Sequence, residues 1–213
     1  MDSITQKNVQ EFISMTRSTA DVNNFTVQFV DAPHVQYPGS TIAVDGYILE
    51  FPKKMFVVAT GKPMLEWLKV MVQQAGHLDQ CFDASPLWQK RLIPGIQKEV
   101  FQALLEWVEG KIEYRETVLE DYIHRVRNMR VDSELRAIAK IKAWKLPIDV
   151  DEYIQQANAS LYFYRVMILY RKWYRAGCAP RNMPAVWSLM PKHFNNDYDV
   201  LPESFVALYR DLI

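Results

Sequence analysis

The sequence predicts an α+β fold, in which a small antiparallel sheet over about residues 24–60 packs on a larger, mainly helical bundle with an extended C-terminal arm. Apolar and polar side chains alternate within 24–60 as they do in strands, whereas from 63 to 177 apolar side chains recur every three or four residues, as they do in helices. Beyond that point, prolines interrupt the chain repeatedly. The predicted domains are 1–62 with an N-terminal helix and the sheet, 63–178 with the helices, and 179–213 with the arm and a short terminal helix.

The predicted sheet rests on three segments. NFTVQFV (24–30) alternates phenylalanine and valine with threonine and glutamine, which is typical of a half-buried strand. In TIAVDGYILEF (41–51), the pair Asp45-Gly46 separates two apolar runs and readily adopts the positive φ angles of a type I′ turn, so a hairpin is predicted there. MFVVA (55–59) supplies a further strand. Together these segments predict the antiparallel sheet.

Most of the remaining chain is predicted to be helical. Pro63 suits the first turn of a helix and Gly76 suits its end. Residues 96–129 keep a helical spacing of apolar side chains, which indicates either one long helix or two helices joined near Gly110. The remaining helices are expected over 2–16, over 134–145 with Asp132 or Ser133 as its cap, over 149–157, over 161–177, and from Pro202 to the C-terminus.

The stretch LYFYRVMILYRKWYRAG (161–177) holds six aromatic residues and is predicted to be a core helix. On a helical wheel its first half is apolar all round, whereas its second half places Arg171, Lys172 and Arg175 opposite the apolar face. Arg165 and these basic residues exclude a membrane span, which requires about 20 apolar residues. The helix is therefore expected to emerge from the core at its C-terminal end.

Charge is balanced overall but unevenly distributed. The formal net charge is zero, yet residues 125–192 contain thirteen Lys or Arg against five Asp or Glu. Such segregation favours acidic and basic faces that pair within or between subunits, with a local basic surface as the alternative. The two cysteines, Cys81 and Cys178, are too few for a disulfide framework. The N-terminus lacks the features of a signal peptide, which predicts a cytoplasmic or virion-associated location.

Two patterns resemble phosphate- or metal-binding motifs but are incomplete. VVATGKP (57–63) places a Gly-Lys pair between a strand and a helix, yet a phosphate-binding loop needs glycine where Phe56 stands and Ser or Thr where Pro63 stands. His77 and Cys81 are four residues apart and could share a helical face, but no further Cys or His follows at ligand spacing. Neither pattern predicts a functional site.

Five glutamates between residues 106 and 120 recur at three- and four-residue steps, which predicts an acidic stripe on one helix face that meets solvent or another subunit. Asp121 and His124 add an acid-x-x-His pair of the kind that carboxylate di-iron bundles use, but the second pair that such sites need is missing. We therefore expect no catalytic, cofactor-binding or metal-binding residues and no enzymatic activity.

These observations favour a non-enzymatic interaction or assembly protein, such as a viral structural or accessory protein, that binds a protein partner or copies of itself through complementary charged faces and the C-terminal arm. The alternative is a nucleic-acid-binding protein that uses the basic region 125–192, with Asn158 at the turn of a helix-turn-helix. Apolar residues at the start of the would-be recognition helix weaken this alternative. No membrane partner is expected. The predicted partner-binding residues are Arg171, Lys172, Arg175, Phe205, Leu208 and Leu212.

Overall fold

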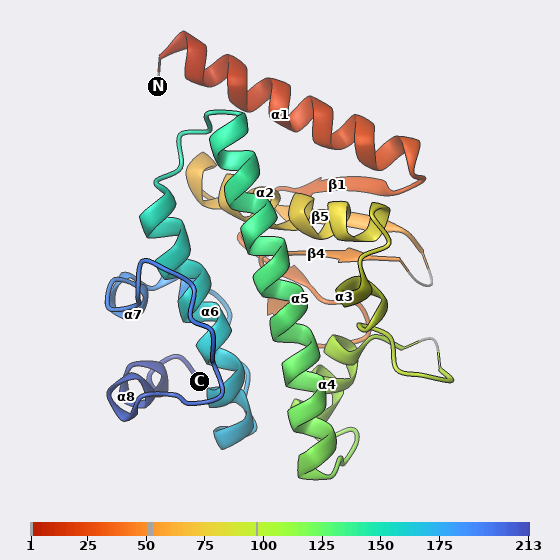
Figure 1. The fold of residues 1–213 in the computed structure, drawn as a ribbon, viewed down its shortest axis with the longest axis vertical. Coiled ribbons are helices and arrows are strands. Elements are labelled where there is room, and N and C mark those ends of the chain that lie inside the picture. Colours follow the sequence, from red (N-terminus) through yellow and green to blue (C-terminus); the bar gives the residue numbers. More distant parts are fainter. Residues whose placement is uncertain (1, 51–52, 97) are drawn as a thin grey trace. The chain divides into compact units, whose positions relative to one another are not determined.

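The computed structural model describes residues 2–50, 53–96 and 98–213 and confirms the α+β fold (Figure 1). The described part of the chain forms sheets of three and two strands together with eight α-helices. It divides into two compact units, each assembled from segments far apart in the sequence. Residue 51 of the predicted hairpin and residue 97 of the predicted helix over 96–129 lie outside the described residues. Unit 1 comprises Met1–Val35, Val44–Ser85 and Asp132–Val150, and unit 2 comprises Gln36–Ala43, Pro86–Val131 and Asp151–Ile213.

The larger sheet lies in unit 1 and has the strand order β1-β5-β4 (Figure 1). These strands are β1 (Thr26–Val30), β4 (Gly46–Leu49) and β5 (Met55–Ala59). Four of the five side chains of β5 are buried, as expected for a central strand covered on both faces. β4 runs antiparallel to β5, but β1 runs parallel to it. The prediction of a purely antiparallel sheet is therefore wrong for β1.

The predicted hairpin at Asp45-Gly46 is also wrong. β3 (Ala43–Val44) pairs with β2 (Val35–Gln36) in the two-stranded sheet, and β4 pairs with β5 instead. Neither residue of the pair is among the described residues with a positive φ angle, so a type I′ turn is not formed. Gly46 serves another purpose, because a Cβ atom there would lie 2.7 Å from the carbonyl oxygen of Val57. Glycine thus allows β4 to approach β5 closely.

Three helices complete unit 1. They are α1 (Ser3–Val22), α2 (Met64–Phe82) and the C-terminal part of α5 (Glu116–Ala143). α1 continues beyond the predicted residue 16 and buries a stripe that includes Val9 and Phe12. α1 packs on β1, and α2 packs on β4 and β5.

The sequence predicts that α2 ends at Gly76, but this prediction is wrong. Gly76 lies inside the helix, where it allows α2 and α5 to cross closely. The helix continues to Phe82, and a Cβ atom at Gly76 would lie 2.3 Å from the carbonyl oxygen of Ser133 on α5. Ser133 is fully buried at this crossing, and its hydroxyl lies 3.2 Å from Nε2 of His77. The predicted helix start at Asp132 or Ser133 is therefore wrong, and α5 runs through both residues without a break.

Unit 2 is built around α6 (Val150–Tyr170), which merges the two helices predicted over 149–157 and 161–177. α6 ends at Tyr170, because Arg171 adopts a positive φ of 49°. The region 96–129 contains two helices, as in the second of the predicted alternatives, and Gly110 with its φ of 72° lies in their connection. The other helices of unit 2 are α3 (Pro86–Gln89), α4 (Val100–Val108), the N-terminal part of α5, the 3₁₀ helix η1 (Pro180–Asn182), α7 (Pro184–Trp187) and α8 (Glu203–Arg210).

The segment 179–213, predicted to be an extended arm, packs on α6 within unit 2 (blue in Figure 1). Its apolar side chains complete a core cluster to which α4, α5 and α6 also contribute. Packing in this way removes large apolar side chains from water, at about 25 cal/mol per Å² buried. None of the helices in the described part of the chain combines the length and apolar character that a membrane span requires. The segment contributes Val186, Met190, Tyr198, Tyr209 and Leu212 to the cluster.

The close crossing of α2 and α5 can be tested with Gly76→Ala. The added methyl group would meet the backbone of Ser133, and overpacking of this kind lowers the free energy of unfolding by about 1–3 kcal/mol. Ser14→Ala, at an exposed position of α1, is the control and should leave stability within about 0.5 kcal/mol of wild type. Chemical denaturation followed by circular dichroism measures both. A G76A variant as stable as wild type would contradict the crossing.

Candidate interaction surface

The C-terminal segment is fixed to α6 by the side-chain amide of Asn158, which is fully buried. Its Nδ2 donates hydrogen bonds to the carbonyl oxygens of Pro191 (2.8 Å) and His193 (2.9 Å), and its Oδ1 accepts one from the hydroxyl of Tyr198. A buried amide without partners would be costly, so these bonds make the path of residues 191–198 a condition of folding. Asn158 lies in the middle of α6, and the predicted helix-turn-helix with a turn at this residue is therefore wrong.

Further hydrogen bonds hold the C-terminal segment before and after the part that Asn158 binds. Gln155 donates to the carbonyl oxygens of Ser188 (3.1 Å) and Met190 (2.8 Å). The hydroxyl of Tyr209, a fully buried residue of α8, donates to the carbonyl oxygen of Ala159 at 2.7 Å. Burial raises the pKa of this phenol well above its usual range. The C-terminal segment is thus an integral part of unit 2.

The three apolar residues predicted to bind a partner face this core. Leu212 is buried, and Phe205 and Leu208 are half-buried against the same cluster. Phe205 makes an edge contact with Tyr162 of α6, with 5.6 Å between ring centroids. These side chains stabilise the chain's own fold.

The three predicted basic residues lie beyond the end of α6, in the connection that follows it. Arg171 donates to the carbonyl oxygen of Trp107 (2.9 Å) and pairs with Glu113 (2.6 Å). The backbone N–H of Arg175 donates to the carbonyl oxygen of Leu212 at 2.8 Å. Lys172 is exposed. Two of the three basic residues therefore tie this connection to the rest of unit 2.

Most of the basic region is engaged in ion pairs with acidic residues of its own unit. Arg165 contacts Glu120 at 2.7 Å, which joins α6 to α5, and Arg127 pairs with Asp199. Charge is also nearly balanced within each unit, with fifteen Lys or Arg against thirteen Asp or Glu in unit 2 and ten against twelve in unit 1. Besides Arg171–Glu113, the other ion pairs of the basic region are Arg125–Asp121, Arg136–Asp132, Arg136–Asp83, Lys140–Asp79 and Lys192–Asp151.

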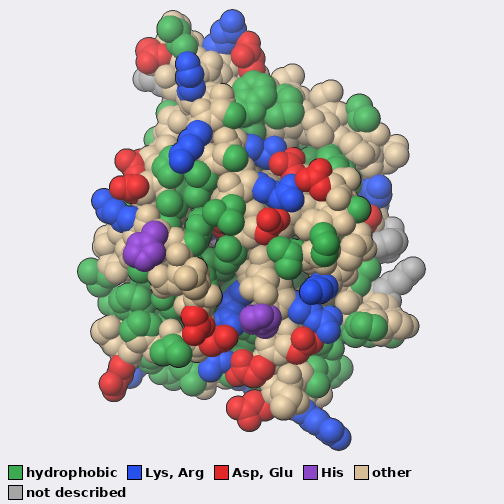
Figure 2. All heavy atoms as spheres, viewed as in Figure 1, with side chains coloured by type: hydrophobic (Ala, Val, Ile, Leu, Met, Phe, Trp, Pro, Cys, Tyr) green, Lys and Arg blue, Asp and Glu red, His purple; other side chains and the backbone are tan. Residues whose placement is uncertain are grey.

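Two apolar side chains of the C-terminal segment remain exposed. Leu189, just after α7, is 59% exposed, and Val200, just before α8, is 72% exposed. On the face drawn in Figure 2, hydrophobic side chains gather at the left, over α7 and α8. α7 and α8 also contact each other. Two large apolar side chains exposed on a segment that is otherwise firmly packed mark a candidate site for contact with another protein.

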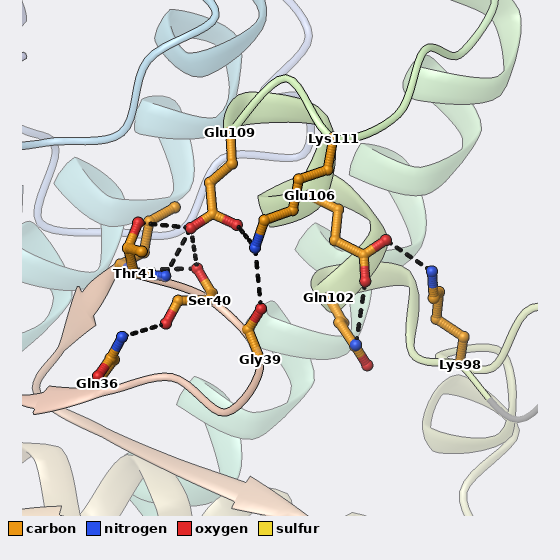
Figure 3. A network of polar contacts seen from close by, with 10 residues as sticks. Gln36, Gly39, Ser40, Thr41, Lys98, Gln102, Glu106, Glu109 and Lys111 are labelled. Carbon is orange, nitrogen blue, oxygen red and sulfur yellow. Dashed lines mark hydrogen bonds and ion pairs between the residues drawn. The ribbon is translucent and has the colours of Figure 1, made fainter.

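Glu109 anchors a polar network that sequence reasoning missed (Figure 3). Its Oε1 accepts hydrogen bonds from the backbone N–H of Thr41 (2.6 Å), the Thr41 hydroxyl (2.6 Å) and the Ser40 hydroxyl (3.0 Å), and Lys111 lies 2.7 Å from its Oε2. Burial raises the pKa of this carboxyl, but the hydrogen bonds from Lys111, Thr41 and Ser40 outweigh it and lower the pKa to about 2. The group is therefore permanently ionised near neutral pH.

The Glu109 network borders a shallow depression of about 380 Å³, lined by residues 36–41 and Lys111. Each oxygen of the Glu109 carboxylate already has partners, which makes it a poor general base. The predicted acidic stripe is also wrong, because the connection after α4 separates its glutamates and several of them pair internally. These pairs are Glu106–Lys98, Glu109–Lys111, Glu113–Arg171 and Glu120–Arg165.

His77, considered above with Cys81 as a metal ligand, lies in a buried hydrogen-bond chain of unit 1. Gln80 donates through Nε2 to Asp132 at 2.7 Å, so its Oε1 is left to accept from Nδ1–H of His77 at 2.8 Å. Nε2 of His77 then accepts from the hydroxyl of Ser133. This connectivity resembles that of a nucleophile, its base and an orienting group. Ser133 is fully buried, however, so a substrate cannot reach it.

The remaining metal hypotheses also lack support. Among the described residues, no group of three or more His, Cys, Asp or Glu side chains is placed to hold a metal ion. Asp121 of the predicted acid-x-x-His pair is engaged with Arg125 at 2.7 Å. Comparison of the chain with protein-family models, curated proteins and solved structures finds no significant match.

Removal of the Asn158 amide should release the segment that it holds. In Asn158→Ala the carbonyl groups of Pro191 and His193 lose their donor, and we expect residues 188–199 to become sensitive to protease and to exchange amide hydrogens at least tenfold faster. Ser160→Ala is a suitable control, since its hydroxyl bonds only within α6, to the carbonyl oxygen of Gln156. Equal protection of the segment in N158A and wild type would contradict the proposed anchoring.

The Glu109 network should make stability depend on acidity. The lowered pKa contributes stability above the ordinary carboxyl pKa of about 4.5, and this contribution is lost as the pH falls toward 2. Glu109→Gln should therefore cost on the order of 2 kcal/mol at pH 7, a difference that shrinks below pH 4. Urea denaturation at pH 7, 4 and 3 tests this, with the exposed Glu116→Gln as control. A difference that does not vary with pH would refute the explanation.

Proposed function

We propose that this chain is a non-enzymatic interaction and assembly protein, which associates with further copies of itself through the outer surface of its C-terminal segment. The observation that carries the proposal is the exposure of Leu189 and Val200 on a segment whose inner face is firmly bonded to α6. A rigid support lowers the entropy lost on binding, and exposed apolar side chains supply the gain. The predicted viral structural or accessory role and the cytoplasmic or virion-associated location belong to the same proposal.

The proposal differs in one respect from what the sequence predicts. The acidic and basic faces expected to meet between subunits find their partners largely within each unit, as in the pair Arg165–Glu120. Apolar contact therefore takes the leading role that complementary charge had in the sequence-based hypothesis. The same pairing weakens the nucleic-acid alternative, because phosphate binding requires basic side chains that are free to meet phosphates.

Deletion of residues 179–213 is not a clean test, since it would uncover the core and leave the amide of Asn158 without partners. Substitution of exposed side chains avoids this difficulty. We expect Leu189→Ser combined with Val200→Ser to raise the dissociation constant of self-association at least tenfold, since burial of a Val or Leu side chain is worth about 1.5–3 kcal/mol and a tenfold change corresponds to about 1.4 kcal/mol.

The matched control is Ile4→Ser combined with Val22→Ser on α1. These side chains are 71% and 79% exposed, so they match the test pair in character but lie in unit 1. Sedimentation equilibrium of the full chain over a range of concentrations measures both double variants. A wild-type chain that stays monomeric throughout, or equal effects of the two double variants, would refute the proposed function.

A further inference from the structure

The outward face of α8 carries an acidic residue at one end and a basic residue at the other. On a helical wheel, Glu203, Ala207 and Arg210 fall opposite the side formed by Phe205 and the buried Tyr209. All three outward residues are exposed. The side chain of Ala207 lies between the two charges and projects little from the helix, so another helix could approach the middle of this face closely.

Glu203 and Arg210 differ from most charged residues of the unit. Neither side chain has a hydrogen bond or an ion pair to any other described residue, whereas the side chains of Arg165, Arg171 and other basic residues are paired. They are seven residues apart, which is about 10 Å along a helix axis, so they lie at opposite ends of α8. The charges are equally far from the midpoint of the face, between Val206 and Ala207.

This arrangement is complementary to itself under a two-fold rotation. If α8 of one subunit lies antiparallel to α8 of another, Glu203 meets Arg210 of the partner subunit, and the reverse pair forms by symmetry. Ala207 at the crossing allows the close helix packing that such contacts need. A partner with a single sign of charge would leave one end of the face repelled.

We infer that α8 forms the centre of a two-fold interface between copies of this chain, in which each Glu203 pairs with Arg210 of the partner subunit. The inference rests on the proposed function, because a helix of eight residues is too small to hold a dimer by itself. The exposed side chains of Leu189 and Val200 supply the additional apolar area of the proposed interface.

A competing explanation for the two charges is the helix dipole. Glu203 stands in the first turn and Arg210 in the last, where each sign is favourable even for an isolated helix. The two explanations differ in one respect. Reversing both charges makes the interaction with the helix dipole unfavourable at both ends of α8. The same reversal restores complementary pairs across a two-fold axis.

The experiment compares E203R, R210E and the double variant E203R/R210E with wild type by sedimentation equilibrium at low salt. Each single variant places like charges together at two symmetric contacts, so we expect its dissociation constant to rise at least tenfold. The double variant should return to within about threefold of wild type. An equimolar mixture of E203R and R210E should form a heterodimer, since both contacts are then complementary.

Lys7→Glu, on the exposed face of α1, is the control for a general effect of charge and should leave association unchanged. Association of wild type that none of the α8 variants alters, or that the double variant weakens more than the single ones, would overturn the two-fold pairing. In that case a loss of association in L189S/V200S would still support the proposed function. A wild-type chain that does not associate at all would overturn both.

Discussion

The buried amide of Asn158 is the constraint on which the architecture of unit 2 depends. It lies in the middle of α6, with no access to water, and its donors and its acceptor are all satisfied by residues of the C-terminal segment. Only chain paths that return the carbonyl groups of Pro191 and His193 to this point are compatible with a folded unit. The inner face of the segment is thereby committed to the fold, and the outer face is left to meet solvent or another chain.

Ion pairs within each unit also join segments that are far apart in the sequence. Arg165 and Glu120 are 45 residues apart, and Arg127 and Asp199 are 72 residues apart. The segregation of basic and acidic residues along the chain therefore reflects contacts between distant segments of one molecule. Because most of these charges are paired within their own unit, they are not free to meet a partner, in contrast to the unpaired Glu203 and Arg210 on α8.

Two polar networks show why a suggestive set of side chains does not define a reactive site. The chain from Ser133 through His77 to Gln80 has the connectivity of a catalytic relay, but it is sealed at the crossing of α2 and α5. The carboxylate of Glu109 borders an open depression, but its hydrogen bonds hold it ionised and occupied. A substrate has no access to the first network, and the carboxylate of the second is already bound by neighbouring residues. Both networks stabilise the fold.

The sequence by itself determined the α+β class, the strands near 26–30 and 55–59, and the helical nature of most of the chain. These features could be predicted because strand alternation and helical spacing depend on residues that are neighbours in the sequence. The tertiary structure alone decided what Gly76, Ser133 and Asn158 do. Each is a small or polar residue that locally suggests a helix end or a turn, and each lies inside a helix because its partner is far away in the sequence. The parallel pairing of β1 and the return of the C-terminal segment were beyond sequence reasoning for the same reason, since both depend on contacts between segments that no local pattern brings together.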